Sequence, residues 1–225
     1  MPTGFSSLPP SGPATPDTAI GGAQAIAALA QKNGFTPFVD MAYQGFGVGL
    51  EEDAYGVRLL AESVPELLVA TSCSKNFGLY RERTGTLSLI ADTPTQVDIN
   101  FSQALNIARG IYSMPPAHGS AVVELILGDA DLNGLWQREL EQMRSRIHSL
   151  RSLLAERLAA RGAAQDFSFI QHQSGMFSFL GISEAQVQQL QQEYSVYMVN
   201  SSRINIAGIS QTNIDYLADA IVAVL

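Results

Sequence analysis

The side chains that could carry covalent chemistry in this chain are few. Of its 13 basic residues only Lys32 and Lys75 are lysines. Lys75 lies in a run rich in hydroxyl groups, Ser72-Cys73-Ser74-Lys75-Asn76. A lysine amine can condense with a carbonyl compound, and desolvation or neighbouring positive charge lowers its pKa toward the reactive neutral form. Taken alone, however, a loop lysine is usually a solvated surface residue.

Two further segments combine charged and aromatic side chains with small residues. Asp40-Met41-Ala42-Tyr43-Gln44-Gly45 precedes the lysine run, and Ser201-Ser202-Arg203-Ile204-Asn205 lies near the C-terminus. A carboxylate can hold a proton on a nitrogen base, and a guanidinium fork can bind a carboxylate through two hydrogen bonds. Each segment also has an ordinary interpretation, as a turn or helix cap for Asp40 and as a surface charge for Arg203. Their joint order and spacing are more specific than any one of them.

Strands that alternate with helices surround the first two segments. Apolar runs with the length of strands cover residues 35–40, 66–72 and 85–91, and helical periods cover 23–34 and 53–64. This alternation predicts an α/β fold with a mostly parallel sheet. In such sheets the functional groups collect at the carboxyl ends of the strands. Asp40 and the Ser72–Lys75 run both stand at such ends.

One long helix organises the rest of the chain. Apolar residues recur every three or four positions from Leu132 to Leu158, with Trp136 among them, and Gly162 follows. This period predicts a single helix with an apolar stripe, on which Trp136 is a core residue. Strand-like runs at 167–170, 175–180 and 196–199, with helices near 183–193 and 212–224, then predict a small α+β domain. We therefore expect an irregular segment over 1–22 and two domains over 23–130 and 131–225.

Composition and charge exclude several classes of protein. The chain has 225 residues, of which 46% are hydrophobic and 15% charged, as in globular proteins. No apolar stretch approaches the ~18 residues that a membrane span needs. A net charge of −8 argues against nucleic-acid binding. The single cysteine, Cys73, excludes an internal disulfide and a multi-cysteine zinc site. We expect a cytoplasmic protein with no metal site.

Five separated motifs together resemble one enzyme family. They are Asp40–Gly45, Ser72–Arg83, Pro115–Gly119 (PPAHG), Gly175–Phe179 (GMFSF) and Ser201–Gly208 (SSRINIAG). In this order they resemble the fold-type I, pyridoxal-phosphate-dependent class I aminotransferases, which include the aspartate and aromatic amino-acid aminotransferases. The resemblance covers about residues 23–225. It implies that 23–130 is the C-terminal part of the cofactor-binding large domain and that 131–225 is the connecting helix with the small C-terminal domain.

The resemblance assigns the cofactor-binding roles residue by residue. Lys75 would form an aldimine with pyridoxal phosphate and, once released, move the proton at the substrate Cα. Asp40 would keep the ring nitrogen protonated, as an electron sink requires. Tyr43 would donate a hydrogen bond to the cofactor's O3′. The positions that match the family's phosphate-binding residues are Ser72, Ser74 and Arg83.

The resemblance also implies substrates and an assembly. Arg203 matches the arginine that grips the substrate α-carboxylate, and Phe177 matches a lesser position of the same site, for which a plain core role is equally plausible. Arg109 matches an arginine that reaches into the partner's site, so a homodimer is implied. The expected reaction is ping-pong transamination of aspartate or an aromatic amino acid with a 2-oxo acid acceptor, 2-oxoglutarate above all. The choice between aspartate and aromatic substrates stays open.

An alternative interpretation starts from length. The chain matches only a little over half of the family's usual length. The family's glycine/serine/threonine phosphate loop at a helix N-terminus, its ring-stacking aromatic residue and a tyrosine from the partner have no counterpart in it. Met1-Pro2-Thr3-Gly4 resembles a family motif that begins with Asn. The alternative hypothesis is therefore a truncated, catalytically silent remnant that acts at most as a dimerisation or interaction module.

Overall fold

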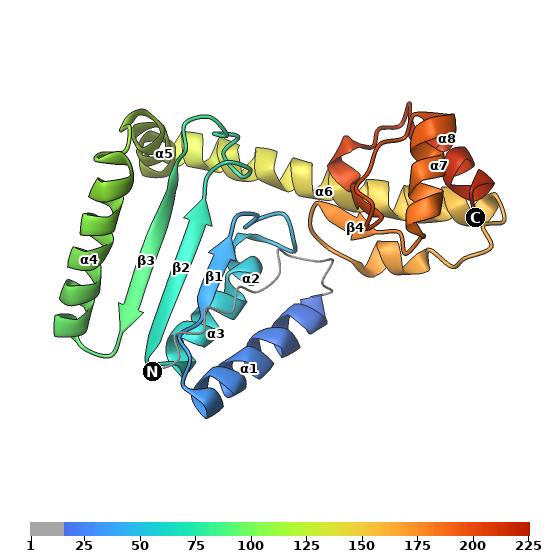
Figure 1. Ribbon diagram of the computed structural model, residues 1–225. Coiled ribbons are helices and arrows are strands. Elements are labelled where there is room, and N and C mark those ends of the chain that lie inside the picture. The colour runs from blue at the N-terminus through green and yellow to red at the C-terminus, as the bar shows by residue number, and fades with distance from the viewer. Residues whose placement is uncertain (1–15) are drawn as a thin grey trace. The chain divides into compact units, whose positions relative to one another are not determined.

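The computed structural model describes residues 16–225, with side chains from residue 21 onward. These residues form two compact units, and Figure 1 labels most of their helices and strands. Unit 1 contains Asp17–Glu141 and unit 2 contains Gln142–Leu225. The helix α6 (Ala130–Ala160) contributes its first turns to unit 1 and its remainder to unit 2.

Unit 1 is an α/β unit built on a three-stranded sheet. Its elements before α6 are α1 (Pro16–Asn33), β1 (Phe38–Met41), α2 (Leu50–Asp53), α3 (Tyr55–Ser63), β2 (Glu66–Ser72), β3 (Gly85–Ala91), α4 (Pro94–Tyr112) and α5 (His118–Gly128). Strand β1 pairs in parallel with β2, with Asp40 beside Ala70. Strand β3 pairs antiparallel with β2, because no crossover helix separates them and the chain turns straight back at Ser72–Gly85. The expected parallel pairing therefore holds for β1 and β2, and β3 runs the other way.

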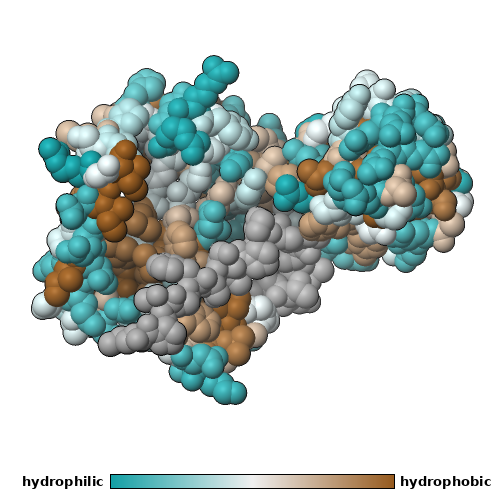
Figure 2. Space-filling view, in the orientation of Figure 1, coloured by the Kyte–Doolittle hydropathy of each residue, from teal (hydrophilic) through white to brown (hydrophobic). Residues whose placement is uncertain are grey.

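The core of unit 1 lies on one side of the sheet. Helices α1 and α3 pack there, with Ala30, Leu60, Leu67 and Val69 all at most 4% exposed. On α4, by contrast, no residue is buried. A groove of about 540 Å³ runs between this helix and the strands β2 and β3, and apolar residues line most of it. Figure 2 shows the corresponding hydrophobic surface between α4 and the sheet.

Unit 2 closes around the second part of α6. It adds the short 3₁₀ helix η1 (Ser168–His172), β4 (Phe177–Phe179), α7 (Glu184–Tyr194), β5 (Arg203–Asn205), the 3₁₀ turn η2 (Ile206–Gly208) and α8 (Ile214–Ala223). Strands β4 and β5 pair antiparallel. The apolar stripe predicted on the long helix is buried at Ile147, Leu154 and Leu158, at 2% exposed or less. Gly162 ends this segment with φ +70, a backbone conformation that glycine adopts without strain.

Several predicted elements differ from the structure. Residues 16–22, expected to be irregular, are the first part of α1, which starts at a proline as many helices do; residues 1–15 lie outside the described residues. The run at 167–170, expected to be a strand, instead enters the 3₁₀ helix η1 at Ser168, because Asp166 accepts the backbone N–H of Ser168 at 2.8 Å and turns the chain. Residues 196–199 form no strand either. None of the described helices combines the length and the apolar composition that a membrane crossing requires.

Candidate active site

The chain makes a tight turn directly after β2, and Lys75 lies in it. The N–H of Gly78 donates to the Lys75 carbonyl at 3.3 Å, with Gly78 at φ +68, and the N–H of Leu79 donates to the Cys73 carbonyl at 3.2 Å. The N–H of Cys73, the residue after β2, donates to the carbonyl of Thr84, the residue before β3, at 3.0 Å. The backbone around Lys75 is therefore fixed at both ends.

Residues far away in the sequence hold this turn from outside. The Asn76 side chain donates Nδ2 to the carbonyl of Gln44 at 3.3 Å, which links the turn to the segment after β1. Trp136 on α6 donates Nε1 to the carbonyl of Asn76 at 2.8 Å, and its ring stacks on Phe77 with centroids 4.4 Å apart. Trp136 is half-buried rather than a full core residue, and its position identifies it as a support of the Lys75 turn.

The segment after β1 brings an aromatic ring to the lysine. Lys75 Nζ lies 4.6 Å from the centroid of the Tyr43 ring, a cation–π distance. The loop that follows Tyr43 is fixed by Asp53, whose carboxylate accepts the backbone N–H groups of Gly45 and Gly47 at 2.8 and 2.9 Å. Asp40 is exposed on β1, in the strand parallel to β2. A carboxylate, a phenol and an amine thus come from the carboxyl ends of two neighbouring strands.

Three predicted phosphate-binding residues line one depression. Ser72, Ser74 and Arg83 all border a cavity of about 310 Å³ at the start of β3. Ser72 Oγ donates to Ser74 Oγ at 3.0 Å, and Ser74 is buried. Arg83 is exposed, has φ +54, and donates Nη1 to the Tyr80 carbonyl at 3.1 Å. Two hydroxyls and a guanidinium are a donor set that fits a phosphate dianion.

Helix α5 packs tightly behind this depression. Gly119, the only buried residue of α5, faces the turn before β3. A Cβ at this position would collide with Thr84 Oγ1 and the Cβ of Glu82. The glycine of the PPAHG motif therefore allows the helix to approach the residues on either side of Arg83.

Unit 2 holds Arg203, the arginine predicted to bind the substrate α-carboxylate. The Arg203 guanidinium lies over the Phe177 ring, 5.0 Å from its centroid. In the register of β4 and β5, Arg203 stands opposite Phe179, so Arg203 and Phe177 share one face of the sheet. Both residues line a cavity of about 560 Å³ together with Asn205. Phe177 is half-buried on this face rather than part of the core.

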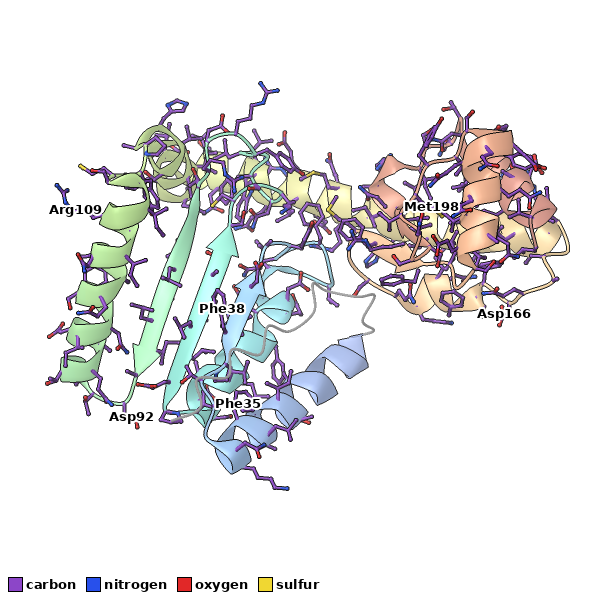
Figure 3. The ribbon with its side chains drawn as sticks, viewed as in Figure 1. Phe35, Phe38, Asp92, Arg109, Asp166 and Met198 are labelled. Atoms are coloured by element: carbon purple, nitrogen blue, oxygen red, sulfur yellow. The ribbon has the colours of Figure 1, made fainter. Side chains whose placement is uncertain are left out.

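Arg109 stands apart from these groups. It lies in the last turn of α4 and is exposed. Figure 3 shows its side chain directed away from the strands of unit 1. The structure therefore does not bring Arg109 to the Lys75 turn.

Two residues make contacts that the sequence did not predict. Trp136 donates to the Lys75 turn, as described above, and its place in a helical stripe gave no sign of this. Arg151 is 1% exposed in unit 2. Its signal was available, because a charged residue occurs four positions after Ile147 and three before Leu154, within the apolar stripe itself.

Comparison with known proteins identifies the fold and the family. The family model "Aminotransferase class I and II" matches residues 16–221. The crystal structure of an aromatic-amino-acid aminotransferase from Burkholderia pseudomallei, covalently bound to pyridoxal phosphate, superposes with a TM-score of 0.86 at 43% identity, over 90% of this chain and 51% of that one. The unit with the predicted Lys75 turn and the unit with Arg203 thus share their fold with pyridoxal-phosphate enzymes, and the α/β prediction is confirmed.

Curated relatives carry both substrate names that the sequence left open. The chain is 50% identical to the aspartate aminotransferase of Haemophilus influenzae over 202 residues, which are 90% of this chain and 51% of that protein. It is 53% identical to the aromatic-amino-acid aminotransferase of Pseudomonas aeruginosa over 188 residues, which are 84% of this chain and 47% of that protein. The chain spans about half the length of the curated relatives it matches. Pyridoxal phosphate is the cofactor of class I aminotransferases, and with a match across 16–221 this chain belongs to the class I and II aminotransferase family.

Proposed function

We propose that this chain binds pyridoxal phosphate at the Lys75 turn and serves transamination between an amino acid, aspartate or aromatic, and a 2-oxo acid. The observation that carries the proposal is the meeting of an amine, a phenol and a phosphate-type donor set at the carboxyl ends of β1 and β2. The likeness to aspartate and aromatic aminotransferases supports the substrate class. Ping-pong kinetics and 2-oxoglutarate as the acceptor belong to the proposal.

The residues present fit the cofactor's polar groups. Ser72, Ser74 and Arg83 would hold its phosphate with hydroxyl and guanidinium donors. Asp40 would hold the proton on its ring nitrogen, and Tyr43 would donate to its O3′. When bound, pyridoxal phosphate supplies an electron sink for the pair released at the substrate Cα.

Lys75 would do the acid–base work of the reaction. Its Nζ is held above the Tyr43 ring by a turn that is fixed at both ends. An amine in this position would remove the proton from the substrate Cα. Because the turn is supported by Trp136 and Asn76, Lys75 needs to reorganise only its own side chain.

Arg203 would bind the substrate α-carboxylate. Its planar guanidinium offers two parallel N–H donors, and the Phe177 ring beneath it leaves the fork free to face a ligand. The cavity that Arg203 and Phe177 line supports this role, since it gives a small acid access to the guanidinium.

Arg109 and the apolar side of α4 support a homodimer. Ile107 and Ile111 on this helix are 61% and 73% exposed, and contiguous apolar surface of this kind is typical of an interface. A second copy that covers α4 would carry Arg109 toward a neighbouring site. The same exposed helix also favours the second candidate function, a catalytically silent interaction module. Binding of pyridoxal phosphate at Lys75 is expected for the enzyme and not for the interaction module.

The test is covalent labelling of the purified chain. We expect incubation with pyridoxal phosphate, removal of the excess and borohydride reduction to fix the cofactor on Lys75, as mass mapping of peptides would record. Lys75→Ala should abolish the label and any transamination, while Lys32→Ala should leave both unchanged. Label spread over Lys32 and the N-terminus, or absent, would favour the interaction module.

A further inference from the structure

Arg151 is the most deeply buried cation that the structure describes. Its side chain is 1% exposed on α6, on the face that also buries Ile147 and Leu154. Removing a guanidinium from water is strongly unfavourable unless other polar groups replace the water. Among the described residues no carboxylate pairs with it, and burial lowers the pKa of Arg151 to about 10, so it stays a cation at neutral pH. We therefore expect the burial of Arg151 without a carboxylate partner to serve a specific structural or functional role.

All of its hydrogen bonds go to one short segment. The acceptors lie along the chain from η1 to β4 and are Ile170 O, Ser174 O, Gly175 O, Phe177 O and Ser178 Oγ. The tightest contacts to carbonyls run from Nη2 to Gly175, at 2.6 Å, and to Phe177, at 2.7 Å. Gly175 has φ +82, so the segment makes a sharp bend at the point where Arg151 holds it. Only Nε of Arg151 has no partner.

The two faces of strand β4 meet different arginines: Arg151 on the face of Ser178 and Arg203 on the face of Phe177. Ser178 is 0% exposed in the core, and its Oγ accepts a hydrogen bond from Arg151 Nη1. Phe177 and Arg203 share the opposite face, where the guanidinium lies 5.0 Å from the ring centroid. Arg151 thus grips the carbonyl of the very residue on which Arg203 rests.

We propose that Arg151 is a positioning residue for the carboxylate site: it fixes the bend before β4 and thereby holds the Phe177 ring under the Arg203 guanidinium. The proposal rests on the proposed function of Arg203. A guanidinium suits this task because its donors form a rigid planar fork, which several converging carbonyls can share. An apolar side chain would leave those carbonyls buried without donors.

The first readout does not depend on catalysis. The Nε–Hε resonance of Arg203 in the ¹⁵N-labelled chain, assigned with Arg203→Lys, reports its position over the Phe177 ring through the ring current. We expect Arg151→Met to shift this resonance and Arg151→Lys to shift it less. The control is Leu154→Ala, which removes an apolar side chain of the same core but none of the hydrogen bonds from Arg151 to the segment. It should leave the resonance in place while the chain is folded.

The second readout is calorimetric binding of succinate, a simple dicarboxylate, to the chain incubated with pyridoxal phosphate. We expect Arg151→Met to weaken binding about 10- to 100-fold, as a ligand site misplaced by about 1 Å does. Arg151→Lys should recover part of the affinity. If Arg151→Met does not fold, Ser178→Ala, which removes one acceptor of the clamp, should give a smaller shift and a smaller loss in the same direction.

The two readouts separate the two proposals. An unmoved Arg203 resonance in a folded Arg151→Met or Ser178→Ala chain would overturn the positioning role. A shifted resonance in a chain whose succinate binding is absent, or is unaffected by Arg203→Lys, would overturn the proposed function of Arg203 and leave the structural linkage intact. Equal losses in Leu154→Ala and Arg151→Met would reduce Arg151 to a general core residue.

Discussion

The two units use the same device in different surroundings. In unit 1 the Lys75 amine lies 4.6 Å from the centroid of Tyr43, and in unit 2 the Arg203 guanidinium lies 5.0 Å from that of Phe177. Each aromatic ring carries a cation that the proposed reaction uses. What differs is the support behind the ring. Loop hydrogen bonds and the indole of Trp136 support the Lys75 side, whereas a buried arginine within a closed core supports the Arg203 side.

The difference in support between the two rings follows from how each unit buries its apolar surface. Unit 2 encloses Leu154, Ile170 and Ile221, all 0% exposed. Unit 1 covers its sheet with α1 and α3 on one side and leaves the apolar groove beside α4 open. In a site built on a closed core, a buried residue can position the groups that face the ligand, as Arg151 positions the Phe177 ring. A site on a sheet with an open side depends on what covers that side.

The largest expected effect tests this difference directly. Leu154→Ala in unit 2 should lower the free energy of unfolding by about 2–5 kcal/mol, because it opens a cavity in a packed core. Ile107→Ala on α4 should change it by no more than about 0.5 kcal/mol, since the side chain is 61% exposed. Urea unfolding followed by circular dichroism measures both.

Concentration sharpens the same comparison. If a second copy covers α4, Ile107→Ala should become more costly as chain concentration rises, and sedimentation should record a weaker dimer. A cost for Ile107→Ala that equals that of Leu154→Ala at every concentration would mean that unit 1 already buries this side chain, and the contrast between the units would fail.

A smaller effect is expected where α5 approaches the phosphate-type depression. Gly119→Ala should destabilise the chain by about 1–3 kcal/mol, because the added methyl collides with a packed neighbour. That neighbour is the Thr84 side chain, next to Arg83. The substitution should therefore also weaken binding of pyridoxal phosphate, measured by its absorbance after removal of the excess.

Gly110→Ala is the matched control. This glycine also lies in a helix, α4, and a Cβ there would meet nothing within 4 Å. Alanine is the better helix former, so the variant should gain about 0.5–1 kcal/mol and keep its cofactor binding. If both variants behaved alike, the close packing of α5 would have no bearing on the site.

The sequence predicted best what is decided locally. The strands over 66–72 and 85–91 coincide with β2 and β3, since each apolar run is bounded by turn residues. Lys75 could be singled out because the chain has only one other lysine. No helix was predicted over 94–112, although Thr93 caps α4 and Pro94 follows, a common signal for the start of a helix.

What the sequence missed depends on tertiary partners. Residues 196–199 have the composition of a strand, but Tyr197 is 79% and Val199 48% exposed, and within the described part of the chain no strand pairs with them. A strand forms only where a neighbour accepts its hydrogen bonds. The support by Trp136 was equally hidden, because the stripe that predicted a core position cannot tell a buried ring from one that donates to a distant turn.

The smallest effect concerns Cys73, between the two serines of the depression. Burial raises the pKa of the Cys73 thiol, so the folded chain should hold the thiol proton to higher pH than the unfolded chain does. The thiolate is the reactive form. Alkylation by iodoacetamide should therefore be slower in the folded chain between neutral pH and about pH 9, near the ordinary thiol pKa. Since this is the chain's single cysteine, the rate needs no assignment.

The same shift has a consequence for stability, which Cys73→Ser isolates. Because the unfolded thiol releases its proton first, the stability that Cys73 contributes should be fully present below the unfolded pKa and decrease as pH rises through it. The serine variant lacks this slope, and the difference between the two chains in urea unfolding at neutral and alkaline pH measures it. A folded thiol that titrated below the unfolded one would mean that Arg83 or Lys75 brings positive charge to Cys73. The depression lined by Ser72, Ser74 and Arg83 would then be electropositive before any phosphate binds. Unit 1 would in that case hold a cation at its proposed ligand site, as unit 2 does with Arg203.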